Sequence, residues 1–205
     1  MGRSLTLVVG TMMTLMGSLE LTAAPMKKSL DKPIFFPHRL GDALVYQHGD
    51  GDAAPEETVS VTKVEETEGA VFVTVARAMK GKPAKNSKAR IDDRGVFWLE
   101  IGSRSFDPPM CILATPTTRG KTWDDAIKLS GGDTAKTKYV IGTEEDIEVP
   151  AGKYRAIRVD VDSEINGEHS MGVEWHAPDV GLVKAVTKVE PAEITITLKS
   201  RTSGK

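Results

Sequence analysis

Four histidines are the side chains best suited to acid–base chemistry or metal binding near neutral pH: His38, His48, His169 and His176. Glu174 stands two residues before His176, so both side chains would share one face of a strand and could offer two metal ligands. No third or fourth ligand can be assigned from the spacing. We therefore expect a solvent-facing polar pair here, and assign no metal and no cofactor.

Other reactive side chains give equally weak signals. Cys111 lies in an apolar run, MCILAT, which favours a buried structural thiol over a nucleophile. The chain contains no Gly-x-Ser-x-Gly elbow, phosphate loop, dinucleotide fingerprint or His-Glu-x-x-His sequence. No catalytic residue is assigned, and the protein is predicted not to be an enzyme.

Clustered carboxylates are explained by turn and strand chemistry. Asp50 and Asp52 resemble the start of a calcium loop, but Val61 stands where the bidentate Glu would be needed, so a turn is predicted. The acidic residues 144–146 are consecutive and would project alternately from a strand. They cannot form the close carboxylate pair that glycoside hydrolysis requires.

The charge balance does not favour nucleic acid as a partner. The 205-residue chain has a formal net charge of −2. Segment 77–90 is locally basic, with six Lys or Arg and no acidic residue. We expect a solvated loop, with a contact to an anionic polymer or a lipid head group as the alternative; the segment lacks the interleaved aromatic residues that single-stranded nucleic acid would use.

The amino terminus resembles a secretory signal. Residues 1–24 begin with a positive charge at Arg3, continue through an apolar stretch and end in small residues. The apolar part is short and diluted for a membrane span, which needs about 20 apolar residues. We expect cleavage after Ala23 or Ala24 and release into the periplasm or the extracellular space, without a stable membrane span. An uncleaved anchor is the alternative.

The elements that must position these side chains are predicted to be strands. Val, Ile and Thr far outnumber Leu, and short alternating runs are separated by Gly, Pro or Asp. Hairpins are expected around 67–69 and at Asn166-Gly167. We predict one curved antiparallel sheet or half-barrel over 35–200, after a short linker at 25–34 and before a disordered tail at 201–205. At most one or two short helices are expected, the candidate being 123–129.

One predicted strand, 94–101, is apolar on both faces. Phe97, Leu99 and Ile101 alternate with Val96 and Trp98. In an antiparallel sheet this pattern indicates a strand covered on both sides, or one whose second face lines a groove.

Three segments resemble a known group of proteins. FFPHRLGDALVYQ at 35–47, VPAGKYRAIRV at 149–159 and WHAPDVGLVK at 175–184 are similar to typical stretches of exported bacterial β-sheet proteins of unknown function, sometimes called TapB-like. Lys121-Thr122-Trp123 also fits, and the resemblance spans 35–198. It implies a curved antiparallel sheet, related to half-barrels that carry lipoproteins, and no known activity.

We therefore expect an exported, non-catalytic binding or structural domain whose concave face binds a hydrophobic or lipid-like ligand or an envelope protein. The expected contacts are Trp98, Tyr139 and Trp175, because aromatic side chains combine large apolar area with a polar edge. Two alternatives remain open: an envelope hydrolase using His169 or His176 with a carboxylate, and an adhesion or assembly module with an unpaired edge strand. The oligomeric state is not predicted.

Overall fold

The computed structural model describes residues 32–51, 53–128 and 134–205. The predicted signal segment and residues 25–31 of the predicted linker lie outside this part. The described residues form strands and turns, without a helix, which confirms the predicted mainly-β fold. The strands are β1 (Ala43–His48), β2 (Glu56–Thr67), β3 (Ala70–Met79), β4 (Lys85–Asp92), β5 (Gly95–Ile101), β6 (Arg104–Ala114), β7 (Thr122–Lys128), β8 (Thr134–Val149), β9 (Gly152–Ile165), β10 (Glu168–Ala177), β11 (Gly181–Val189) and β12 (Ala192–Thr202).

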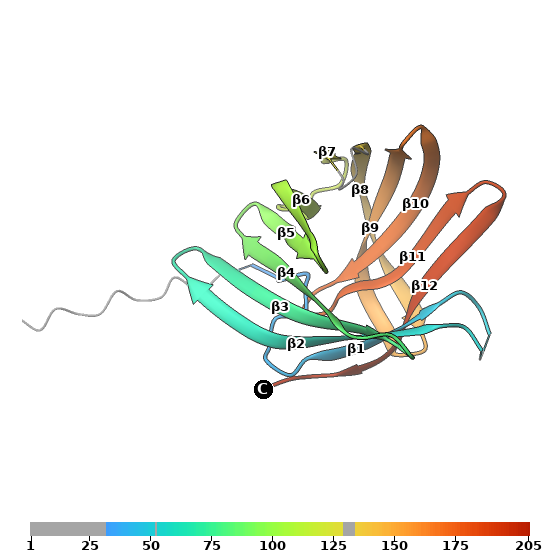
Figure 1. The fold of residues 1–205 in the computed structure, drawn as a ribbon. Helices are drawn as coiled ribbons and strands as arrows, with labels where there is room; N and C mark the ends of the chain where they lie inside the picture. Colours follow the sequence, from blue (N-terminus) through green and yellow to red (C-terminus); the bar gives the residue numbers. More distant parts are fainter. Residues whose placement is uncertain (1–31, 52, 129–133) are drawn as a thin grey trace, which may run out of the picture.

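The 12 strands form one antiparallel sheet that curls into a nearly closed, barrel-like shape (Figure 1). Its order is β6-β5-β4-β3-β2-β1-β12-β11-β10-β9-β8-β7, so two six-stranded meanders join where β1 pairs with β12. Nearly every pairing links neighbours in the chain, as expected for strands joined by tight turns. The first and last strands therefore lie in the middle of the sheet.

Both predicted hairpins are confirmed. Thr67 pairs with Ala70 across a two-residue turn that joins β2 to β3. Ile165 pairs with Glu168 across Asn166-Gly167, and these two residues have φ angles of 53° and 84°. Two successive positive φ values define a type I′ turn, whose twist matches that of the flanking strands.

The two edges of the sheet, β6 and β7, meet through side chains. Asp125 accepts the backbone N–H of Cys111 at 2.9 Å, and the indole N–H of Trp123 donates to the carbonyl of Cys111 at 3.2 Å. Side chains of β7 thus satisfy both backbone groups of one β6 residue in place of a strand ladder. The edge strand that an assembly module would leave unpaired is covered at this point.

The helix predicted over 123–129 is wrong: Thr122–Lys128 is strand β7, paired along its length with β8, while residue 129 lies outside the described part. Trp123, Asp125 and Ile127 are the half-buried positions, which is the period of a strand. Seven residues are too few to sustain a helix without tertiary support, and pairing with β8 supplies a better partner for the backbone.

The basic segment 77–90 is not a single solvated loop. Arg77 belongs to β3, and residues 85–90 belong to β4. The Lys88 ammonium lies 5.4 Å from the centre of the Phe72 ring, and the Arg90 guanidinium 4.8 Å from that of Phe97. The aromatic partners missing from the segment itself come from the neighbouring strands β3 and β5. Lys88 thus covers the Phe72 ring of β3, and Arg90 the Phe97 ring of β5.

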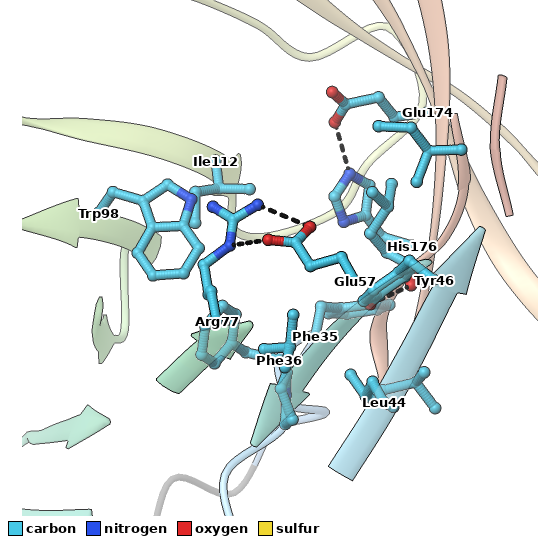
Figure 2. Close-up of a pocket in the computed structure, with 15 residues that line it drawn as sticks. Phe35, Phe36, Leu44, Tyr46, Glu57, Arg77, Trp98, Ile112, Glu174 and His176 are labelled. Atoms are coloured by element: carbon cyan, nitrogen blue, oxygen red, sulfur yellow. Dashed lines mark hydrogen bonds and ion pairs between the residues drawn. The ribbon is translucent and has the colours of Figure 1, made fainter. Parts of the chain in front are cut away.

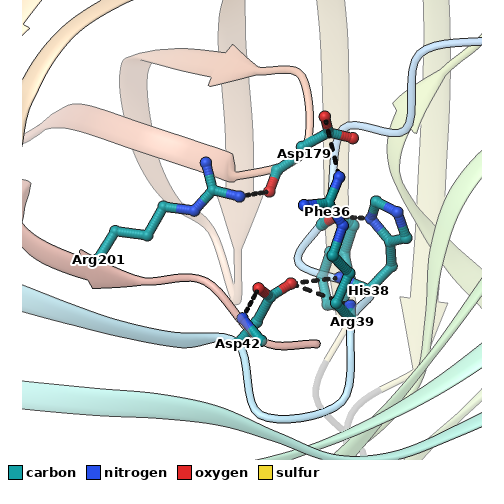
Figure 3. Close-up of polar contacts among 7 residues, drawn as sticks. Phe36, His38, Arg39, Asp42, Asp179 and Arg201 are labelled. Atoms are coloured by element: carbon teal, nitrogen blue, oxygen red, sulfur yellow. Dashed lines mark hydrogen bonds and ion pairs between the residues drawn. The ribbon is translucent and has the colours of Figure 1, made fainter.

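Two residues of the predicted tail at 201–205 belong to strand β12. β12 continues through Thr202, which pairs with Ala43. Asp42 is 2% exposed and accepts the backbone N–H groups of His38, Arg39 and Gly204 at 3.1, 2.9 and 2.8 Å (Figure 3). One carboxylate therefore holds the turn before β1 against the end of the chain.

The interior of the curved sheet is closed off by the segment before β1. Phe35 packs with Leu113 and Ile141, while Phe36 packs with Val73 and Val96. The backbone N–H of Asp179 donates to the carbonyl of Ile34 at 2.6 Å, which anchors this segment to the turn before β11. Residues 35–37 thus act as the floor of the concave face.

Within the described ranges, none of the secondary-structure elements is a helix long and apolar enough to cross a membrane.

Candidate binding cavity

A cavity of about 200 Å³ lies between the floor segment and the inner face of the sheet (Figure 2). Most of its lining is apolar, with a polar group of four side chains on one side. The lining residues are Phe35, Phe36, Pro37, Leu44, Tyr46, Glu57, Val59, Arg77, Trp98, Ile112, Glu174, His176, Val180, Leu182 and Ile196. A concave, mostly apolar site with a few polar groups is the usual form of a small-molecule site.

The apolar wall is built around Trp98. Its ring packs edge-on against Phe36, with centroids 5.3 Å apart and planes at 80°. Val96, two residues earlier, is buried on the same inner side of β5. The second apolar face predicted for this strand therefore points into the concavity. The floor segment fills part of that space and leaves the rest as the cavity.

A carboxylate–guanidinium pair forms the first half of the polar side. Arg77 donates from Nε and Nη2 to the two oxygens of Glu57 at 2.8 and 3.1 Å, and His48 Nε2 lies 3.2 Å from Glu57. Burial raises the pKa of Glu57, but the Arg77 hydrogen bonds and charge, with His48, outweigh it and hold the pKa below its usual value. Glu57 therefore remains ionised although it is only 8% exposed.

The second half is a histidine–glutamate pair on β10. His176 Nε2 lies 2.8 Å from Glu174 Oε2, and His176 is 2% exposed. The predicted shared face is confirmed, but the prediction that this face meets solvent is wrong. Glu174 pairs with Val159 and His176 with Ile157, both buried, so register places this polar face inside the sheet. Met171, on the opposite face, is 58% exposed.

Tyr46 completes the cavity with a satisfied hydroxyl. Its O–H donates to the backbone carbonyl of Leu182 at 2.9 Å, linking β1 to β11. Burial raises the pKa of Tyr46 far above its usual value. The Tyr46 hydroxyl is therefore neutral and its proton is hydrogen-bonded to Leu182, while its ring lines the cavity.

The three predicted contacts lie in different places. Trp98 lines the cavity. Tyr139 is buried in a separate cluster, stacked on Trp123 with ring centroids 4.8 Å apart. Trp175 lies on the outer face, where its N–H donates to Glu145 at 2.8 Å and Lys184 covers its ring. The structure does not bring these three residues together.

The remaining candidates lie outside the cavity. His169 is exposed on the outer face, 2.6 Å from Asp162. Cys111 is buried, and burial together with the nearby Asp125 carboxylate raises its thiol pKa to about 12. Asp50 lies in a bend outside any strand, and Asp52 is outside the described residues. Where the chain is described, no group of three or more His, Cys, Asp or Glu is arranged to hold a metal ion.

Sequence reasoning missed the floor segment, Glu57 and Arg77. A signal for Arg77 was present: Val71, Val73, Val75 and Arg77 continue one alternation, which places Arg77 on the inner face. The inward position of Glu57 follows from its pairing with Tyr46 and cannot be read from its neighbours in the sequence. The floor segment has no periodic pattern, because it is neither a helix nor a strand.

Comparison with known proteins supports the architecture only. No model of a known protein family matches the sequence, and no curated protein sequence is significantly similar to it. Two solved structures are similar in fold. One is a candidate exported protein with a YmcC-like fold from Bacteroides fragilis (TM-score 0.61, 14% identity); the other is a candidate lipoprotein from Parabacteroides distasonis (TM-score 0.59, 15% identity). Each likeness covers 84% of this chain and 100% of the other chain.

This chain therefore has the fold of these two bacterial proteins. The fold places it in a class of curved antiparallel β-sheet proteins that includes a YmcC-like example. At 14% and 15% identity, the likeness carries no activity from one chain to the other.

Proposed function

We propose that this protein is an exported, non-catalytic binding protein whose curved sheet holds a small hydrophobic or lipid-like ligand. The observation that carries the proposal is the apolar cavity of about 200 Å³ on the concave face, with Trp98 and Phe36 in its wall. Binding of an apolar group is favourable in such a cavity, because it removes the apolar surface of the lining from water.

Two residues of the polar side, Arg77 and Glu174, are partly exposed to solvent. The side chains of Arg77 and Glu174 are 31% and 30% exposed, whereas the aromatic floor residues are buried. A ligand would place its apolar body against the floor and its polar end on the polar side. Any chain longer than the cavity would leave through this side.

Export is part of the proposal. It is supported by the signal-like composition of residues 1–24 and by the descriptions of the two structural neighbours as a candidate exported protein and a candidate lipoprotein. The kinship with TapB-like proteins and lipoprotein carriers belongs to the same proposal. In a bacterial host, the mass of the exported protein should correspond to a chain that begins at Ala24 or Pro25. A mass that retains residues 1–24 would support an uncleaved anchor instead.

Binding is tested with two matched variants. Val59→Phe would fill the cavity, because Val59 lines it, whereas Val140→Phe makes the same change beside a groove on the outer face. The full chain is expressed with its own amino terminus, purified, extracted with organic solvent and examined by mass spectrometry. Ethylbenzene binding is then followed by ligand-detected NMR.

Apolar molecules should be extracted from the wild type and from Val140→Phe, and ethylbenzene should bind to both. Val59→Phe should lose both signals while keeping the wild-type circular dichroism spectrum. Failure of the wild type to bind ethylbenzene would contradict the proposal, and so would equal binding by all three proteins.

A second candidate, the envelope hydrolase, is favoured by one observation: His176 and Glu174 are 2.8 Å apart inside the cavity. A carboxylate that orients an imidazole is one part of several hydrolytic sites. The described lining offers no Ser, Thr or Cys as a nucleophile, so the imidazole would have to activate water. Hydrolysis of p-nitrophenyl acetate above the rate of the His176→Gln variant would support this candidate.

A further inference from the structure

His176 presents a hydrogen-bond acceptor to the cavity. An ionised carboxylate can only accept, so the 2.8 Å contact with Glu174 requires the proton of a neutral imidazole to be on Nε2. Nδ1 then carries a lone pair. Among the described residues Nδ1 has no hydrogen-bond partner, although His176 is 2% exposed and lines the cavity.

Arg77 also lines this cavity. A guanidinium has five N–H groups, and Glu57 receives bonds from Nε and Nη2. The other N–H groups of Arg77 have no acceptor in the described part of the chain. Figure 2 shows the Glu57 carboxylate between the Arg77 guanidinium and the His176 ring, with Phe35 and Phe36 below.

The polar side holds charges of both signs, so an ionised head of either sign would meet a like charge there. Glu57 and Glu174 carry one negative charge each and Arg77 one positive charge, so with neutral histidines the polar side has a formal charge of −1. An anionic head would add to this excess, and a cationic head would meet the Arg77 guanidinium. A like charge at close range costs more in a poorly solvated site than in water.

We propose that the ligand is a neutral alcohol: a compact apolar body whose hydroxyl group donates to Nδ1 of His176. This inference rests on the proposed binding function and names the chemical class of the ligand. A hydroxyl group can donate without carrying a charge, so it matches the unused acceptor of His176.

The cavity volume sets the size of the test ligands. A cavity of 150 Å³ accommodates benzene, so about 200 Å³ corresponds to roughly eight non-hydrogen atoms. Benzyl alcohol and ethylbenzene each have eight and differ only in a hydroxyl in place of a methyl group. Benzylammonium also has eight, and benzoate has one more. These four compounds separate the effects of hydrogen bonding and charge at nearly constant size.

The experiment measures the dissociation constants of the four compounds for the full chain by NMR titration near pH 7.5. His176→Phe removes the acceptor and keeps an aromatic ring. His169→Phe is the matched control, since His169 is exposed on the outer face. In the wild type, benzylammonium and benzoate should bind at least roughly tenfold more weakly than benzyl alcohol. In His176→Phe, benzyl alcohol should lose roughly tenfold in affinity while ethylbenzene changes less than twofold.

A direct measurement keeps the test independent of how well His176→Phe folds. In wild-type protein with ¹⁵N-labelled histidine, Nδ1 of His176 should resonate as an unprotonated nitrogen and shift when benzyl alcohol binds. Ethylbenzene should leave that resonance in place. A protonated Nδ1, or one that does not respond to benzyl alcohol, would overturn the inference.

The outcomes separate the inference from the function on which it rests. If ethylbenzene binds but His176→Phe weakens both neutral compounds equally, the alcohol inference fails and the binding function stands. The same holds if either charged compound binds as tightly as benzyl alcohol. If ethylbenzene does not bind to the wild type at all, the proposed binding function itself fails.

Discussion

Asp125 on β7 accepts the backbone N–H of Cys111 on β6 at 2.9 Å, so a side chain joins the two edges of the sheet. This bond closes a curved sheet whose edge strands do not form a ladder with each other. Open edges expose unpaired backbone groups that can recruit other chains. The Asp125–Cys111 contact therefore has a structural role at the seam, separate from the cavity.

The first prediction concerns the charge of Asp125. Burial raises its pKa above the ordinary value near 3.8, and the neighbouring Asp124 adds to this, although the Cys111 N–H opposes it. Because the folded state holds the proton more tightly, wild-type stability should fall as the pH rises from about 3.8 through the raised pKa. Asp125→Asn keeps an acceptor oxygen and lacks this titration.

Urea unfolding between pH 3.5 and 7 measures this effect. The free energy of unfolding of Asp125→Asn relative to wild type should increase through that window and then level off. Asp125→Ala, which leaves the Cys111 N–H without an acceptor, should be less stable by about 1–3 kcal/mol. A stability difference between Asp125→Asn and wild type that does not change with pH would contradict the prediction.

The second prediction concerns Glu57. Burial acts to raise its pKa, but the bonds from Arg77 and the proximity of His48 lower it overall, below the ordinary value of 4.5. The resulting stabilisation is fully present above pH 4.5 and is lost as the pH falls through the folded-state pKa. Glu57→Gln should therefore lose less stability than the wild type as the pH falls below 4.5. At pH 7 its free energy of unfolding should be lower than that of the wild type by about 2 kcal/mol, because Arg77 loses its partner.

Glu148→Gln is the control for this prediction. Glu148 forms an exposed ion pair with Lys153 at 3.6 Å, and such pairs contribute about 0–1 kcal/mol. The free energy of unfolding of Glu148→Gln should fall at low pH as that of the wild type does. If Glu57→Gln and Glu148→Gln lose stability in parallel with the wild type below pH 4.5, the Arg77–Glu57 pair does not govern the acid response.

The third prediction concerns Cys111. Burial, with the Asp125 carboxylate, raises its thiol pKa from 9.0 to about 12, which lowers the thiolate fraction at pH 8 by roughly a thousandfold. Ellman's reagent should therefore react with the native protein at least roughly a hundredfold more slowly than with the protein in urea. Equal rates in the two conditions would show that the thiol is accessible and reactive.

The sequence contained most of the strand architecture, because alternation directly reports which side chains share a face. Val73 and Val75, predicted to share a face, are completely buried. The turn predicted at Asn166-Gly167 is present, with positive φ angles at both residues. The same reasoning failed on β10, where the more apolar face points outward. There the register with Ile157 and Val159 decides the orientation, and register depends on partners far away in the sequence.

The cavity was only partly predictable for a related reason. Trp98 could be identified because its strand is apolar on both faces. The polar side combines residues from β2, β3 and β10, and only the closure of the sheet brings these strands to one space. A sequence pattern reports neighbours along one strand and the hairpin next to it. It does not report contacts across the interior.

The last prediction concerns Asp42, which ties the start of the domain to its end. Its carboxylate accepts the N–H groups of His38, Arg39 and Gly204 (Figure 3). Gly204 packs so closely against the Leu40 carbonyl that an added Cβ would clash with it. Asp42→Ala removes the three acceptor contacts together and should lower the free energy of unfolding by about 3 kcal/mol, measured in urea.

Asp179→Asn is the matched control for Asp42→Ala, because the Asp179 side chain forms only a 3.8 Å exposed ion pair with Arg39, and Asn tolerates its φ of 59°. It should change stability by less than about 0.5 kcal/mol. Asp42→Ala should also increase amide exchange at Gly204 and Lys205, because the carboxyl-terminal segment loses its anchor on the turn before β1. Unchanged exchange at Gly204, with stability near that of the wild type, would show that β12 holds the end of the chain without Asp42.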